Sequence, residues 1–227
     1  MFQSPITSIE YDDRSTGMVA IVNVDSEQLP RISEAAELAG AVHAVCDGVE
    51  ACLTKIDKAS VACIVADAKI ACGPEPNLFT RLEQAGIDVP VITTRANADQ
   101  AGCRKPWRVL SVDAQLDRVT VSIREAIEES RRRRLDRAAV ESFYEAIERL
   151  SADEHAVMKA VCDGKLNKQI AREFGVSIRT VEQRRRRVFA KMEVTSAVPL
   201  ASRVATVKTI ERLRPRLRRR LFDQQHH

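Results

Sequence analysis

Short apolar runs rich in β-branched residues alternate with longer amphipathic stretches from residue 18 to residue 128. Such short runs predict buried strands, and the stretches between them repeat their apolar residues with a helical period. Strands that alternate with helices form a parallel sheet with helices on both faces, so this part is predicted to be a doubly wound, five-stranded α/β domain. The predicted strands cover residues 18–24, 41–46, 61–67, 89–94 and 107–112, and the predicted helices cover 26–40, 48–56, 77–86 and 114–130.

The predicted domain organisation has four parts. An N-terminal tail covers residues 1–17 and the α/β domain covers 18–128. Residues 129–150 form a linker helix, since no proline or glycine occurs between Asp117 and Leu150. An all-helical domain with a basic C-terminal tail covers 151–227.

The charge distribution separates the front of the chain from the rear. Residues 1–149 contain 18 Lys and Arg against 24 Asp and Glu, whereas residues 150–227 contain 18 against 8. A basic rear segment indicates a polyanionic partner. With no membrane-length apolar run and no signal pattern at the start, we expect a cytoplasmic protein.

No motif of the sequence predicts an enzyme, a metal site or a cofactor. There is no glycine-rich phosphate loop and no Ser/His/Asp pattern, and the four histidines have no ligand spacing. The six cysteines form no CxxC pair, so we expect buried, reduced thiols.

Four helices are predicted after Leu150, and two of them form a helix-turn-helix. Ser151–Glu154 is a capping-box pattern that starts the first helix, Asn167 is predicted to cap the second, and Ser177 the third. The fourth extends from about Val198 to Leu213. The short "GVS" turn between the second and third helices is typical of the DNA-binding helix-turn-helix, whose second member enters the major groove.

A helical wheel divides the third helix, which contains the run Arg184–Arg187. Its predicted core face consists of Ile178, Val181, Val188, Phe189 and Met192. The opposite face carries Arg179, Gln183, Arg186, Arg187 and Ala190, the side chains expected to meet the groove. Arg184 and Lys191 lie on one flank, where phosphates are expected, and Arg185 points to the edge of the core. The alternative is that the run is only a solvated face.

The segment "LSADEHAVMKAVCDGKLNKQIAREFGVSIRTVEQRRRRVFAKMEVTS" resembles the LuxR-type DNA-binding domain of FixJ/NarL-like response regulators. It departs from the family pattern with Arg184 in place of a histidine and Ala156 in place of a glutamate. The resemblance implies a sequence-specific transcriptional regulator, with Lys168, Arg184 and Lys191 on phosphates and Arg179, Gln183, Arg186 and Arg187 near base edges. It also implies a desolvated ion pair between Glu154 and Arg185.

The front domain resembles a response-regulator receiver, in which an aspartate at the end of the third strand accepts a phosphoryl group. Asp67 matches that position, and Thr93 or Thr94 matches the switch hydroxyl. The carboxylate pair that would hold Mg²⁺ is replaced by Asn23 and Val24, so only Asp25 remains. We therefore expect a pseudo-receiver that is not switched by Mg²⁺-dependent phosphorylation. The alternatives are a conventional switch at Asp67 and a sigma-factor-like adaptor of RNA polymerase.

The linker helix carries an apolar stripe at heptad spacing, formed by Val140, Phe143, Ile147 and Leu150. It predicts either a dimerising helix or a helix packed on its own domain. A homodimer through this helix or through the receiver-like domain is expected, and RNA polymerase is a second candidate partner. The run Arg131–Arg134 is interpreted as a solvated face, with contact to the DNA backbone as the alternative.

Overall fold

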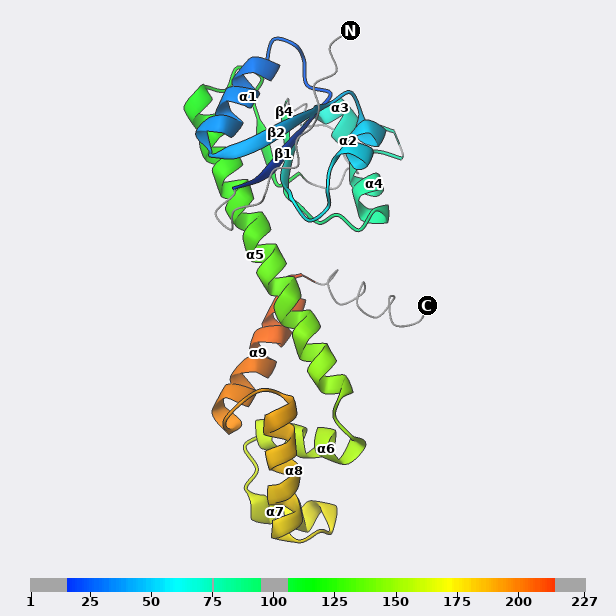
Figure 1. Cartoon of the computed structure of the whole chain (residues 1–227), viewed down its shortest axis with the longest axis vertical. Helices are drawn as coiled ribbons and strands as arrows, with labels where there is room; N and C mark the ends of the chain where they lie inside the picture. Colours follow the sequence, from blue (N-terminus) through cyan, green and yellow to red (C-terminus); the bar gives the residue numbers. More distant parts are fainter. Residues whose placement is uncertain (1–15, 75, 95–105, 215–227) are drawn as a thin grey trace. The chain divides into compact units, whose positions relative to one another are not determined.

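The computed structural model describes residues 16–74, 76–94 and 106–214 (Figure 1). The chain forms two compact units that divide between Arg133 and Arg134. We call them the front unit and the rear unit. One helix, α5 (Leu116–Glu148), contributes its first part to the front unit and its second part to the rear unit.

The front unit contains the predicted five-stranded parallel sheet, with strand order β2-β1-β3-β4-β5. The fifth strand is confirmed but covers three residues instead of six, and β3 is buried at all seven of its residues. Burial on both faces explains why this strand is a continuous apolar run. The strands are β1 (Thr16–Val22), β2 (Ala41–Cys46), β3 (Val61–Asp67), β4 (Val91–Thr94) and β5 (Arg108–Leu110).

Helices cover both faces of the sheet, as a doubly wound fold requires (Figure 1). One face packs against α1 (Leu29–Leu38) and the first part of α5. The other packs against α2 (Val49–Lys55), the short α3 (Ala68–Ala71) and α4 (Leu78–Gln84). None of the helices in the described ranges combines the length and the apolar composition that a membrane span needs.

Five of the six cysteines lie in the described ranges, and Cys103 lies outside them. Cys46, Cys52 and Cys63 are free and buried in the front unit, and Cys162 is free and half-buried in the rear unit. Burial raises the pKa of Cys52 and of Cys63 to about 12. Cys72 is disulfide-bonded, so the expectation of a reduced thiol there is wrong. Cys72 directly follows α3 and is half-buried.

The rear unit contains the four predicted helices, and their caps explain where they begin. They are α6 (Ala152–Cys162), α7 (Asn167–Phe174), α8 (Ile178–Lys191) and α9 (Ala197–Leu213). Ser151 and Glu154 form the predicted capping box, and the Ser177 hydroxyl accepts from the Thr180 N–H at 3.1 Å. The cap of α7 is one residue earlier than predicted, because the Leu166 N–H donates to the Gln169 side chain at 2.7 Å.

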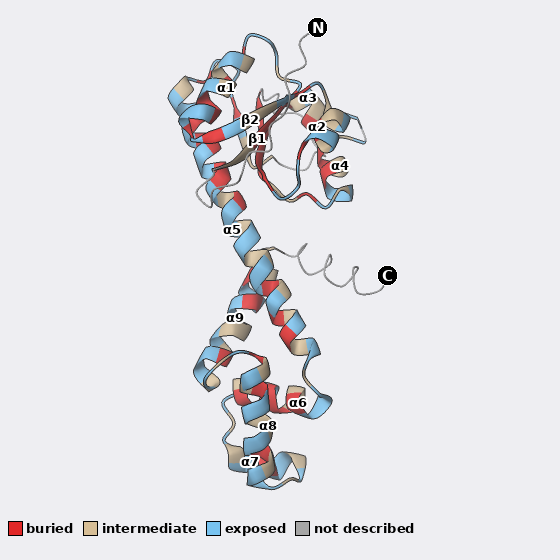
Figure 2. Cartoon of the chain, viewed as in Figure 1, coloured by how far each residue is buried: buried red, intermediate tan, exposed pale blue. Residues whose placement is uncertain are grey.

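The apolar stripe of α5 is part of the rear unit's own core. Val140 is fully buried, Phe143 is 8% exposed, and Ile147 and Leu150 pack against the same cluster (Figure 2). Val207 and Ile210 of α9 belong to the cluster as well. The second of the two predicted interpretations therefore holds for the stripe: it packs on its own unit, whose side chains cover it.

Candidate nucleic-acid interface

The turn between α7 and α8 holds the two helices in a helix-turn-helix. Gly175 ends α7 in the left-handed region with φ 65°, which a residue without a Cβ adopts at least cost. The Val176 N–H then donates to the Ala171 carbonyl at 3.0 Å, and Ser177 caps α8 directly afterwards. The buried side chains Ile170 and Val181 join the two helices to the rear core.

Burial around α8 divides the helix into a core face and an exposed face (Figure 2). Val181, Val188 and Met192 are fully buried, as predicted for the core face, and Phe189 is half-buried. Ile178 is 46% exposed, so its assignment to the core is wrong. It is the first residue of α8, where the chain has only just left the turn. The exposed face carries Ile178, Arg179, Glu182, Gln183, Arg186, Arg187 and Ala190.

Five of the seven side chains predicted to contact DNA, four cations and one glutamine, are exposed to solvent. Within the described part of the chain, none of their side chains makes a hydrogen bond or an ion pair. Their charges are therefore free to meet a ligand without first breaking an internal contact. These residues are Lys168 on α7 and Arg179, Gln183, Arg186 and Arg187 on α8.

Arg184 differs from its neighbours because it is engaged within the rear unit. Its guanidinium makes an ion pair with Asp153 of α6, and its side chain is only 20% exposed, whereas that of Asp153 is 65% exposed. An ion pair with so exposed a carboxylate contributes little to stability. The helical wheel placed Arg184 on a flank of α8, and the structure adds that this flank faces the start of α6.

Lys191 is the partner of Glu154. Its Nζ lies 2.6 Å from Glu154 Oε2 and 2.8 Å from the Arg149 carbonyl oxygen. The predicted pair between Glu154 and Arg185 is therefore wrong, although Glu154 is buried as predicted, with a side chain that is 5% exposed. The hydrogen bond from Lys191, together with that from the Ser151 N–H, holds the pKa of Glu154 below its usual range.

Arg185 packs on an aromatic ring instead. Its guanidinium carbon lies 5.4 Å from the centre of the Phe189 ring, a cation–π contact one helical turn away. The wheel placed this side chain correctly at the edge of the core. It did not distinguish a carboxylate partner from an aromatic one.

Two acidic residues near this surface were missed by the sequence analysis. Asp153 was considered only as part of a capping pattern, although its position next to Glu154 was a signal that the start of α6 is doubly acidic. Glu182 was not considered, although it is the one acidic residue within α8 and it is exposed.

The front unit places Asp67 at the carboxyl edge of the sheet. Asp67 is 7% exposed, and its Oδ1 accepts a hydrogen bond from the Lys69 N–H at 2.7 Å, which caps the short helix α3. Thr94 is its register partner on β4. The Thr94 Oγ1 is buried and has no hydrogen-bond partner within the described residues.

The segment after β1 does not supply a carboxylate pair. Asn23 is exposed with φ 49°, and Val24 packs its side chain against the core beneath α1 and α5. Asp25 is exposed and accepts a long hydrogen bond of 3.4 Å from Gln28. In the described ranges, no group of three or more His, Cys, Asp and Glu side chains is arranged to hold a metal ion.

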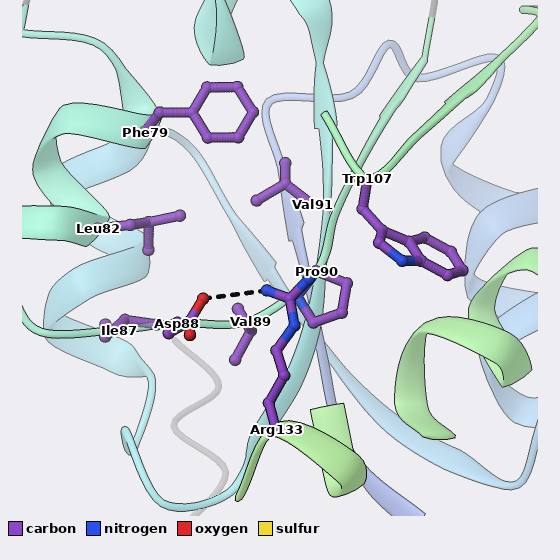
Figure 3. Close-up of a pocket in the computed structure, with 9 residues that line it drawn as sticks. All are labelled: Phe79, Leu82, Ile87, Asp88, Val89, Pro90, Val91, Trp107 and Arg133. Carbon is purple, nitrogen blue, oxygen red and sulfur yellow. Dashed lines mark hydrogen bonds and ion pairs between the residues drawn. The ribbon is translucent and has the colours of Figure 1, made fainter. Parts of the chain in front are cut away.

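A cavity of about 300 Å³ lies in the front unit near the start of β4, at the opposite end of the strands from Asp67 (Figure 3). Arg133 and Asp88 form an ion pair at this cavity, with Nη1 and Oδ1 3.0 Å apart. Because Val89–Val91 lead into β4 and Asp67 ends the parallel strand β3, the cavity and Asp67 lie at different ends of the strands. Its lining is otherwise apolar and consists of Phe79, Leu82, Ile87, Val89, Pro90, Val91 and Trp107.

The sequence of this chain is similar to those of known bacterial regulatory proteins. Residues 148–204 match the family GerE, bacterial regulatory proteins of the luxR family. The chain is 24% identical over 185 residues to the transcriptional regulatory protein FixJ of Bradyrhizobium diazoefficiens, which covers 79% of this chain and 90% of FixJ. It is also 24% identical over 216 residues to the response regulator protein TodT of Pseudomonas putida, which covers 93% of this chain and 92% of TodT.

Among solved structures, the response regulator StyR has the same fold. The TM-score is 0.61 at 21% sequence identity, over 83% of this chain and 98% of StyR. The match to TodT and the match to StyR each extend over most of the chain. The protein is a homologue of the FixJ and TodT response regulators, and its rear unit contains a LuxR-type helix-turn-helix domain.

Proposed function

We propose that this chain is a sequence-specific DNA-binding transcriptional regulator that inserts α8 into the major groove. The observation that carries the proposal is the exposed face of α8, where three arginines and a glutamine have no internal partner among the described residues. Fixed arginines and amides on a capped helix are the side chains that bind guanine and adenine edges. No catalytic role is proposed for any residue.

The polar side chains expected to contact DNA divide by their targets. Arg179, Gln183, Arg186 and Arg187 are assigned to base edges, because they share the exposed face. Lys168 and Arg184 are assigned to phosphates. Lys191 uses two of its three ammonium donors on Glu154 and Arg149, and its side chain is 37% exposed, so it contributes at most one further donor to a phosphate.

We further propose that control does not depend on conventional Mg²⁺-dependent phosphorylation. A hard divalent cation needs several oxygen ligands, and the two positions expected to carry a carboxylate pair after β1 hold Asn23 and Val24, which leaves the exposed Asp25. The Asp67 carboxylate is also engaged, since it caps α3. The second candidate, a conventional switch at Asp67, is favoured by the buried Thr94 hydroxyl beside it, which is without a hydrogen-bond partner in the described residues.

Binding to DNA is tested with the full chain and a randomised duplex library in the absence of RNA polymerase. Enrichment of a defined sequence is the expected result. Binding that appears only when RNA polymerase is added would favour the sigma-factor-like adaptor instead. Two-fold symmetry in the enriched sequence would indicate a homodimer, for which the front unit is the proposed surface.

Phosphorylation is tested with a small phosphodonor, with and without Mg²⁺, and with Asp67→Asn as the control. We expect no Mg²⁺-dependent incorporation. Incorporation that requires Mg²⁺ and disappears in Asp67→Asn would establish the second candidate and overturn the proposed mode of control.

A further inference from the structure

The exposed face of α8 contains a carboxylate among its cations. Glu182 lies three residues after Arg179 and four before Arg186, so all three share one side of the helix. Glu182 is exposed, and its carboxylate makes no hydrogen bond or ion pair with any described residue. The other acidic residues closest to the α8 cations, Asp153 and Glu154, are both paired.

Burial places Glu182 on the exposed side of α8, toward its edge. With about 100° per residue, Glu182 lies roughly 40° from Arg186 and roughly 60° from Arg179. The half-buried Phe189 lies roughly 20° from Glu182 on its other side. If Arg186 and Arg179 face the groove, Glu182 lies beside them at the groove as well.

A carboxylate in this place opposes general binding to DNA. It lies among groups that attract phosphates, and its charge repels the same phosphates. It also loses water when the helix enters the groove, a cost that only a hydrogen-bond donor on the DNA can offset. Glu182 therefore favours one kind of site and disfavours the others.

The major groove offers two kinds of amino donor. Cytosine presents its N4 amino group, whereas adenine presents its N6 amino group next to the N7 acceptor. A carboxylate has no donor for N7, so adenine would be left partly unsatisfied and is better matched by an amide such as that of Gln183. The cytosine N4 group matches a carboxylate without an unsatisfied neighbour.

We propose that Glu182 is a specificity-determining residue that accepts a hydrogen bond from the N4 amino group of a cytosine in the major groove. This inference rests on the proposed DNA-binding function. Unlike the arginines around it, Glu182 lowers affinity for DNA in general and raises the preference for one base pair. Its removal therefore has the opposite effect on random DNA to the removal of an arginine.

The test selects binding sites from a randomised duplex library with the full-length protein and with Glu182→Ala. The enriched duplex and a shuffled duplex are then titrated with both proteins. We expect a C·G position in the parent's selected sequence that becomes degenerate with Glu182→Ala. The ratio of specific to shuffled affinity should fall about 5- to 150-fold, the equivalent of the ~1–3 kcal/mol of one base contact. Affinity for the shuffled duplex should stay equal or rise.

Glu173→Gln is the matched control. It removes the same charge from α7, where the carboxylate is bound by Lys165 at 2.7 Å, and should raise affinity for all duplexes without changing the selected sequence. If Glu182→Ala selects the same sequence as the parent, the inference is overturned while the proposed function stands. If the parent enriches no sequence at all, the proposed function fails and the inference fails with it. Melting temperatures equal to the parent's confirm that both variants are folded.

Discussion

The cations of α8 differ in what they already touch. Arg185 packs on the Phe189 ring. Arg184 and Lys191 lie against the acidic start of α6, where Asp153 and Glu154 hold them. Arg186 and Arg187 face solvent. Side chains of one chemical type, adjacent in the sequence, therefore have different roles, because a helix turns them toward different neighbours.

Arg186 and Arg187 should each contribute to base preference. Alanine at either position should weaken binding to the selected duplex by about 1–3 kcal/mol and relax preference at one base pair. Titration of the selected duplex and its single-base variants measures both effects. Lys168→Ala is the control, which should weaken binding to all duplexes alike and reduce the salt dependence. Unchanged affinity and unchanged preference in both arginine variants would refute the assignment of this face.

Because of Glu154, the free energy of unfolding of the rear unit should decrease at acidic pH. Its pKa is lowered in the folded protein by the Lys191 hydrogen bond and by the Ser151 N–H, so its contribution is present above the usual carboxyl range. As the pH falls from 4.5, the ordinary value, through the folded pKa, the unfolded state takes up the proton first and this stability is lost.

The measurement is the unfolding of the rear unit between about pH 5 and pH 3, compared with Glu154→Gln. The parent should lose on the order of 1 kcal/mol more than the variant over this range, since the Lys191 partner is partly solvated. Parallel pH profiles for the two proteins would show that the pair contributes nothing to stability.

At the scale of elements, local chemistry predicted most helices and strands. Ser151 and Ser177 start helices because their hydroxyls accept hydrogen bonds from backbone N–H groups of the first helical turn, and Gly175 ends one. These effects act within a few residues, so they can be predicted from the sequence. The partner of Glu154 could not be predicted, because Arg185 and Lys191 both carry a positive charge on α8. Only the packing of α6 on α8 selects between them.

The stripe on α5 shows the same limit. Its heptad spacing predicts an apolar surface but not the identity of the partner, which is α9 and the rear core. Val207 and Ile210 lie about sixty residues farther along the chain than the stripe they help to cover, a separation at which no local pattern carries information.

Phe143 should therefore be required for the stability of the rear unit. Phe143→Ala should destabilise that unit by about 3–5 kcal/mol, because the ring is 8% exposed and its removal leaves a cavity. Thermal unfolding measures the loss, and sedimentation measures the oligomeric state. Leu135→Ala is the matched control, since Leu135 is 65% exposed on the same helix. A change in oligomeric state without a change in stability would restore the dimerising role of the stripe.

At the scale of the whole molecule, the division into two units was anticipated by the change from alternating strands and helices to helices alone. The exact division was not, because α5 continues through it without a break. A continuous helix offers no proline, glycine or change of period to mark where one core ends and the next begins.

Mg²⁺ should not stabilise the protein appreciably. A ligand that binds only the native state raises the melting temperature by mass action, and the exposed Asp25 beside Asn23 and Val24 is a weak ligand set. Melting curves of the parent and of Asp67→Asn in millimolar Mg²⁺ should match those in its absence. A rise seen in the parent and lost in Asp67→Asn would point to an ion held at the carboxyl edge of the sheet.

The buried thiols of the front unit can report when that unit opens. Thiolates react with alkylating reagents and thiols do not, so burial and a raised pKa protect Cys52 and Cys63 while the front unit is folded. Cys162 lies in the rear unit. Pulse labelling followed by mass spectrometry should modify Cys46, Cys52 and Cys63 together as the front unit opens, at a rate independent of Cys162. The opening of the front unit can thus be timed in the intact chain, without separating the two units.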